Sequence, residues 1–149
     1  MALAVGKKDL VIRSAPTGVA AYNLLKRTLH SLFRLPIKGM GQDISTSTLK
    51  ALQTLFANCN YLIIDEKSMI DLKMLALIDA RLREIFPLRS IEPFGGMSVL
   101  LCGDFFQLPP VGGMSLYQDL PRIDNLLIIA GQQAYRSLDQ TLRLLEIMR

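Results

Sequence analysis

The chain has 149 residues, half of them hydrophobic, and carries a formal net charge of +4 with a sequence pI near 9.3. This length suits one domain or part of one, and the basic charge permits nucleic-acid binding without indicating it. The longest apolar runs, such as 61–64 and 99–102, are far shorter than the roughly 18 residues of a membrane span, so no contact with a membrane is expected. Cys59 and Cys102 lack Cys or His neighbours at metal-ligand spacing, which excludes a zinc site and favours an intracellular location.

Apolar strands alternate with helical stretches, a pattern typical of α/β proteins with a parallel sheet flanked by helices. Residues 10–14 predict a first strand, which is followed by a turn at 15–18 and a helix over 19–25. Residues 60–65 form an apolar run that ends in acid, as expected for a central parallel strand buried on both faces.

Apolar residues recur at three- and four-residue spacing between Leu72 and Ile85, which predicts an amphipathic helix packed on the sheet. Prolines and glycines then predict a loop over 87–96, and residues 98–103 predict another buried strand. A further short strand is predicted at 126–130, followed by a closing helix and strand over 134–149. No internal repeat or interdomain linker is evident.

Two of the predicted strands end in acid. Asp65 and Glu66 follow the first apolar run, and Asp104 follows the second. Ligands of open parallel sheets bind beyond the carboxyl ends of the strands, where one carboxylate can hold Mg²⁺ while its neighbour orients or deprotonates a water molecule. This arrangement suits phosphoryl transfer. The alternative is that the acidic pair only caps a helix beginning near Ser68.

Three longer motifs occur in a fixed order. The chain has SAPTGVAAYNLLKRTLHSLFRLP from Ser14, YLIIDEKSMI from Tyr61 and FGGMSVLLCGDFFQLPPVGG from Phe94. They resemble motifs Ia, II and III of the Pif-type superfamily 1 DNA helicases, including the helicase part of Helitron transposon proteins. The last residues, YRSLDQTLRLLEIMR, resemble the start of motif IV. The resemblance implies an incomplete RecA-like P-loop NTPase fold, with residues 1–149 as a partial N-terminal helicase domain.

The resemblance also implies roles for single residues at the nucleotide site. Asp65 would hold Mg²⁺, Glu66 would act as the catalytic base for water, and Gln107 would contact the γ-phosphate of ATP. Arg149 would be the motif IV arginine that stabilises charge on that phosphate.

A DNA path is implied in the same way. Thr17, Gly18, Thr28, His30 and Ser31 would line it, through contacts to phosphates that do not read sequence. Without the resemblance, His30 would be interpreted as a structural histidine. Phe105, Phe106 and Pro109 could shape the groove or pack in the core. A loose basic cluster of Lys26, Arg27, Arg34 and Lys38 could be a solvated face or a phosphate contact.

The chain departs from the family pattern in three respects. It contains no GxxxxGK[ST] phosphate loop, and Gly6-Lys7 is followed by Lys8. We therefore expect that loop to be encoded upstream within roughly 30 residues, the span of a βαβ unit, and the second RecA-like domain to lie downstream. Lys67 stands where an apolar residue is usual, and Lys26 replaces a usual glycine.

The function that the resemblance implies is that of a piece of an ATP-dependent DNA helicase. It would unwind duplex DNA from 5′ to 3′ along a single strand in repair, recombination or telomere maintenance, in the nucleus of a eukaryote or in a mitochondrion. The first alternative is a non-catalytic relic of a transposon helicase that binds single-stranded DNA weakly or not at all. The second is another nucleotide-driven enzyme, such as a transposase or a packaging ATPase.

Overall fold

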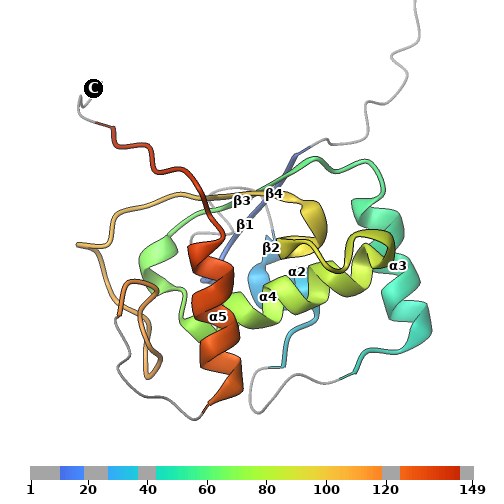
Figure 1. Ribbon diagram of the computed structural model, residues 1–149, viewed down its shortest axis with the longest axis horizontal. Coiled ribbons are helices and arrows are strands. Elements are labelled where there is room, and N and C mark those ends of the chain that lie inside the picture. The colour runs from blue at the N-terminus through green and yellow to red at the C-terminus, as the bar shows by residue number, and fades with distance from the viewer. Residues whose placement is uncertain (1–10, 19–26, 37–42, 119–124, 145–149) are drawn as a thin grey trace, which may run out of the picture.

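The computed structural model describes residues 11–18, 27–36, 43–118 and 125–144. These residues form a parallel sheet with helices packed against it (Figure 1). In chain order the elements are β1 (Val11–Ala15), β2 (Arg27–Thr28), α2 (Leu29–Phe33), α3 (Thr46–Phe56), β3 (Tyr61–Ile64), η1 (Lys67–Met69), α4 (Leu72–Ile85), η2 (Pro87–Arg89), η3 (Pro93–Gly96), β4 (Ser98–Leu101) and α5 (Leu126–Arg136).

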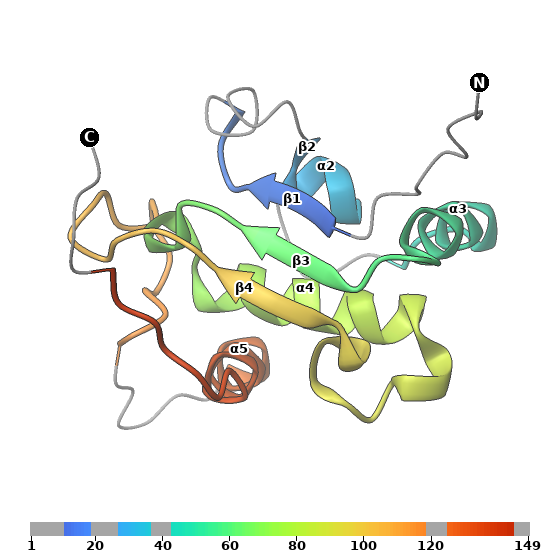
Figure 2. The same cartoon turned by 90° about the horizontal axis from the view of Figure 1, so that it is seen from above.

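The four strands lie in the order β2-β1-β3-β4, and every pair is parallel. Ile64 of β3 is level with Ser14 of β1 on one side and with Leu101 of β4 on the other. The arrowheads of β1, β3 and β4 therefore point the same way in Figure 2, and their carboxyl ends meet at one edge of the sheet. The predicted central position of the strand before Asp65 is confirmed.

Helix α4 supplies much of the core. The side chain of Asp71 caps its first turn by accepting from the amide of Met74 at 2.6 Å. Its buried residues share one apolar cluster with Leu62 and Ile64 of β3. The helix predicted between Leu72 and Ile85 is confirmed, and Figure 1 places it with α5 on the same side of the strands.

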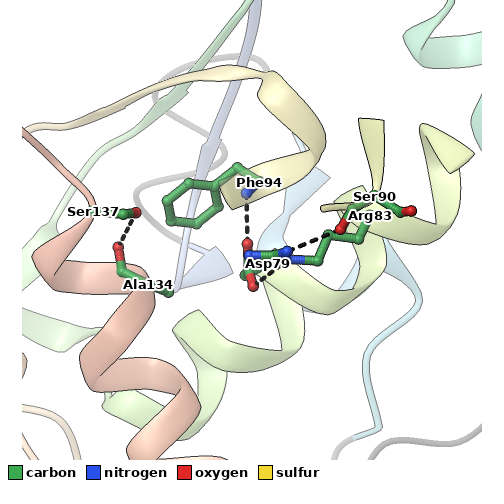
Figure 3. Close-up of polar contacts among 6 residues, drawn as sticks. All are labelled: Asp79, Arg83, Ser90, Phe94, Ala134 and Ser137. Carbon is green, nitrogen blue, oxygen red and sulfur yellow. Dashed lines mark hydrogen bonds and ion pairs between the residues drawn. The ribbon is translucent and has the colours of Figure 1, made fainter. Parts of the chain in front are cut away.

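Asp79 of α4 anchors the loop that follows this helix (Figure 3). Its carboxylate accepts from the backbone amide of Phe94 and from Arg83 Nε, at 2.8 Å for the arginine. Arg83 also donates to the carbonyl of Ser90 at 2.9 Å. Gly95 has φ +58°, and a Cβ there would lie 2.6 Å from the carbonyl oxygen of Leu82, so this turn requires glycine. The predicted loop over 87–96 is confirmed and consists largely of two short 3₁₀ turns.

The prediction for residues 126–144 was wrong, whereas the last five residues, where the closing strand was also expected, lie outside the described part of the chain. Residues 126–130 do not form a strand, because they are the first turns of α5, whose cap Asn125 accepts from the amides of Leu127 and Ile128. A short apolar run has no periodicity that separates a strand from a buried helix. The helix ends at Arg136, where Ser137 donates to the carbonyl of Ala134 (Figure 3), and residues 138–144 form neither helix nor strand.

Two further predictions differ from the structure or lie outside its described part, and one helix was not predicted. The strand expected over 98–103 is shorter and only half-buried, with Leu100 44% exposed, because β4 pairs on one side only among the described residues. Helix α3 was not predicted, and the helix expected over 19–25 lies outside the described residues. In the described ranges no helix has the length and apolar character needed to cross a membrane.

The packing of α5 on α4 depends on Gly131. A Cβ at this position would lie 1.9 Å from the carbonyl oxygen of Leu72. The two helices can therefore come this close only because glycine has no side chain. Gly to Ala within an exposed helix normally stabilises by about 1 kcal/mol. We expect the opposite for Gly131→Ala, which should lower the free energy of unfolding by about 1–3 kcal/mol because the added methyl group overpacks the contact between the helices.

Thermal denaturation of the purified protein measures this effect. Gln133→Ala is the matched control on the same helix, because Gln133 is exposed and its replacement should change stability by no more than about 0.5 kcal/mol. An equal or higher melting temperature for Gly131→Ala would contradict the described packing of α5.

Candidate functional site

The candidate site lies at the carboxyl edge of the sheet. The ladder of backbone hydrogen bonds continues past the ends of the strands, since the amide of Asp65 donates to Ser14 O at 2.9 Å and the amide of Cys102 donates to Ile64 O at 2.7 Å. The residues that follow β1, β3 and β4 are therefore held side by side by the backbone. The structure thus brings together Thr17, Glu66 and the loop that begins at Gly103.

The acidic pair directly follows the central strand, and both side chains are partly buried. The amide of Glu66 donates to Asp65 Oδ1 at 2.9 Å. Glu66 itself has left-handed backbone angles, φ 54° and ψ 48°, which turn the chain out of the strand. Such angles are uncommon for a residue with a side chain and cluster at functional sites.

The helix-capping interpretation of this pair is not supported. Glu66 occupies the cap position of the short turn η1, but its side chain makes no capping hydrogen bond. The helix itself begins at Leu72, and Asp71 caps it. The expected helix start near Ser68 was therefore wrong by four residues. The carboxylate of Glu66 accepts a hydrogen bond from Thr17 instead.

The end of β4 holds the backbone of Glu66 in place. The amide of Lys67 donates to the carbonyl of Cys102 at 2.9 Å. Gly103 has φ +124°, and a Cβ at this position would lie 3.0 Å from the amide nitrogen of Lys67 and 3.3 Å from the Cα of Glu66. Sequence reasoning did not assign this role, although a glycine directly after an apolar strand is a signal of close backbone approach.

Glu66 is bound on its other side by the predicted DNA path. Thr17 Oγ1 donates to Glu66 Oε2 at 3.2 Å, in a partly buried contact. Thr17 lies two residues beyond β1, whose last residues Ser14 and Ala15 are fully buried. Gly18 is exposed, and among the described residues other than its chain neighbours nothing lies within 4 Å of where its Cβ would be.

The loop after β4 carries Gln107 away from the sheet. Asp104 shapes the turn, because its carboxylate accepts from the amide of Phe106 at 3.0 Å and its carbonyl accepts from the amide of Gln107 at 3.1 Å. Gln107 is exposed, and the Phe106 side chain is 98% exposed, so Phe106 is not part of the core.

Phe105 lies in an aromatic cluster. Its ring meets Tyr117 and Tyr135 edge-on, at centroid distances of 5.1 and 6.5 Å. Lys67 Nζ lies 4.5 Å from the centroid of the same ring, which is a cation–π contact. This contact explains how a lysine is accommodated after the acidic pair, where the motif usually has an apolar residue. Burial raises the pKa of the Tyr135 hydroxyl, which therefore stays protonated at neutral pH.

The other predicted DNA-contacting residues lie beside β1, where Thr28 of β2 is level with Ala15. Thr28 Oγ1 accepts from the amide of Ser31 at 3.3 Å and so caps the short helix α2. Its hydroxyl proton can still be donated to a phosphate. Ser31 is exposed and His30 is partly exposed.

Some predicted positions cannot be placed. Arg149, Lys26 and Lys38 lie outside the described residues, whereas Arg27 and Arg34 are exposed.

Both cysteines are free thiols, and burial raises the pKa of Cys59. In the described ranges no group of three or more His, Cys, Asp or Glu side chains could hold a metal ion.

Comparison with known proteins identifies the family and the fold of this chain. A family model described as PIF1-like helicase matches residues 2–149. The ATP-dependent DNA helicase PIF1 of Danio rerio is 40% identical over 103 residues, which are 66% of this chain and 15% of that protein. The ATP-dependent DNA helicase RRM3 of Saccharomyces cerevisiae is 38% identical over 109 residues, 71% of this chain and 15% of that protein. The chain thus spans about 15% of the length of these relatives.

Solved structures show the same fold. The crystal structure of Bacteroides Pif1 bound to ssDNA superposes with a TM-score of 0.58 and 41% identity, covering 68% of this chain and 24% of that chain. The complex of Bacteroides sp Pif1 with ADP-AlF4 gives a TM-score of 0.57 and 43% identity over 68% of this chain and 24% of that chain. The parallel sheet with flanking helices is therefore part of a RecA-like fold, as predicted. Because the family model covers almost the whole sequence, the chain belongs to the PIF1-like helicase family.

Proposed function

We infer that this chain forms the water-activating and DNA-contacting part of an ATP-dependent DNA helicase. The observation that carries the proposal is the position of the Glu66 carboxylate. Glu66 follows the central strand next to Asp65, its backbone is held by the close approach of Gly103 after β4, and its carboxylate accepts from Thr17 of the predicted DNA path. The names of the relatives support the same function, since PIF1 and RRM3 are ATP-dependent DNA helicases.

Asp65 is the residue that would hold Mg²⁺. Its carboxylate is partly buried at the end of β3, and a hard cation of this kind prefers oxygen ligands and keeps several water molecules. One carboxylate with water fits such an ion. The bound Mg²⁺ would neutralise charge on the phosphates of ATP. The Glu66 amide, by donating to Asp65 Oδ1, fixes the orientation of this side chain.

Glu66 would serve as the general base. A carboxylate that accepts a proton from the attacking water must lie beside the γ-phosphate and must not be bound up in a helix cap. Glu66 meets the second condition, because its side chain makes no capping hydrogen bond. Gln107, on the exposed loop after β4, would contact the γ-phosphate, and Arg149 would stabilise its charge.

The DNA substrate would be a single strand bound through its phosphates. Hydroxyls of Thr17, Thr28 and Ser31 can donate to phosphate oxygens, and Gly18 leaves room for close approach of the strand. His30 would complete this surface. By family resemblance, movement would be from 5′ to 3′, in repair, recombination or telomere maintenance, with the nucleus or the mitochondrion as the place of action.

The first experiment replaces the base in the complete helicase polypeptide that contains this chain. We expect Glu66→Gln to keep nucleotide binding and to slow ATP hydrolysis by roughly a hundredfold or more, because the amide keeps the shape of the side chain and loses its basicity. Steady-state phosphate release and binding of a fluorescent nucleotide measure the two effects.

Glu92→Gln is the matched control for this replacement. Glu92 is an exposed carboxylate that pairs with Arg89 on the surface, and its loss should leave turnover unchanged. Near-normal hydrolysis by Glu66→Gln would show that the water is activated by another group.

The second experiment concerns the 149-residue chain alone. We expect no ATPase activity above background, because its sequence lacks the glycine-rich loop whose amides and lysine hold the phosphates. Phosphate release is measured with and without single-stranded DNA. DNA-stimulated hydrolysis that is abolished by Asp65→Ala would contradict this expectation.

A further inference from the structure

The hydrogen bond between Thr17 and Glu66 joins two residues for which different tasks are proposed. Thr17 belongs to the DNA path and Glu66 to the chemistry of ATP, and 49 positions separate them in the chain. Their contact is direct, at 3.2 Å from Thr17 Oγ1 to Glu66 Oε2. No chain of intermediate residues is needed to link the two sites.

Both residues are attached to the rigid part of the fold. Thr17 follows β1, and Ser14 of that strand accepts the backbone hydrogen bond of Asp65 at 2.9 Å. The backbone of Glu66 is fixed by the close approach of Gly103 and by the bond from Lys67 N to Cys102 O. The distance between the hydroxyl and the carboxylate is therefore set by the register of the sheet.

The contact with Thr17 fixes the orientation of the Glu66 carboxylate. The bond from Thr17 Oγ1 turns Glu66 Oε2 toward the DNA path. A threonine hydroxyl has one proton to donate, and a DNA phosphate is an anionic acceptor that competes for it. Gly18 next to Thr17 is exposed, and among the described residues nothing apart from its chain neighbours lies within 4 Å of where its Cβ would be, so a phosphate can approach from the described side.

We propose that Thr17 is a positioning residue. Its hydroxyl restrains the Glu66 carboxylate by a hydrogen bond until a phosphate of single-stranded DNA accepts that hydrogen bond in place of Glu66. The proposal rests on the proposed function and adds to it the step by which DNA binding releases the base. Because coupling between two sites is reciprocal, withdrawal of the Glu66 carboxylate should in turn favour DNA binding at Thr17.

Three variants of the complete helicase polypeptide test this coupling. Thr17→Val keeps the shape of the side chain and removes the hydroxyl, whereas Thr17→Ser keeps the hydroxyl. Thr54→Val is the matched control, because Thr54 lies on the exposed face of α3 and its hydroxyl donates to the carbonyl of Lys50 in the same helix. Melting temperatures confirm that all three proteins are folded.

The readout is the rate of ATP hydrolysis with and without single-stranded DNA. Thr17→Val should raise the DNA-free rate by roughly ten- to a hundredfold, the effect of losing one hydrogen bond to a charged group, and should reduce stimulation by DNA. Thr54→Val should behave like the wild type, and Thr17→Ser, which keeps the hydroxyl, should reverse most of the effect of Thr17→Val. Structural damage at Thr17 would lower the DNA-free rate, so the sign of the change separates the two explanations.

A second measurement does not depend on hydrolysis. Glu66→Ala should tighten the binding of labelled single-stranded DNA when Thr17 is present and should have no such effect in the Thr17→Val background. Additive effects of the two replacements on the affinity would overturn the proposed competition.

The possible failures are distinguishable. A wild-type protein that hydrolyses no ATP with or without DNA would overturn the proposed function and this inference together. A wild-type protein with DNA-stimulated hydrolysis, whose Thr17→Val variant keeps the same DNA-free rate, would overturn this inference alone.

Discussion

The parallel backbone ladder between β1, β3 and β4 is the constraint on which the rest of the site depends. It continues one residue beyond the strands, from Asp65 N to Ser14 O and from Cys102 N to Ile64 O. A slip of one residue in either pairing would turn every side chain to the opposite face. It would also move the acidic pair away from Thr17. The register is therefore as important for the proposed chemistry as the identity of the acids.

The register is in turn secured by the helical layer. Buried residues of α4 share a core with β3, and α4 is fixed at its start by Asp71 and near its middle by Asp79, whose carboxylate holds the loop that leads into β4. These two carboxylates bind backbone amides and have no part in the proposed chemistry. Among the described residues, acids thus serve two purposes, since Asp71 and Asp79 hold the backbone while Asp65 and Glu66 form the candidate site at the carboxyl edge of the sheet.

The sequence allowed the α/β class, the central strand and the helix α4 to be predicted, because each has a long apolar pattern with clear boundaries. The run at 126–130 was misread as a strand since its length suits both structures. The β4 strand was expected to be buried, but hydrophobic residues do not reveal whether a strand has one neighbour or two. Helix α3 was overlooked because it is rich in threonine and serine, which have no strong helical preference.

The sequence named candidate residues for the site but did not show which of them are in contact. Motif resemblance identified Asp65, Glu66 and Thr17, but the hydrogen bond between Thr17 and Glu66 arises from strand order, which no local pattern contains. The left-handed backbone of Glu66 and the close approach of Gly103 likewise depend on tertiary structure. The lysine after the acids looked like a departure from the motif, and its contact with Phe105 could be recognised only in three dimensions.

The loop that carries Gln107 is tied at both ends to the stretch that follows the acidic pair. Cys102 O accepts from Lys67 N where the loop begins, and Met114 O accepts from Leu72 N where it ends, each at 2.9 Å. The two hydrogen bonds close the loop when the chain folds. Doubling the length of the loop would add only about 0.6 kcal/mol to the entropic cost of that closure. Insertions at its tip would change how far Gln107 reaches without altering the register of the sheet, so the loop and the strands can evolve separately.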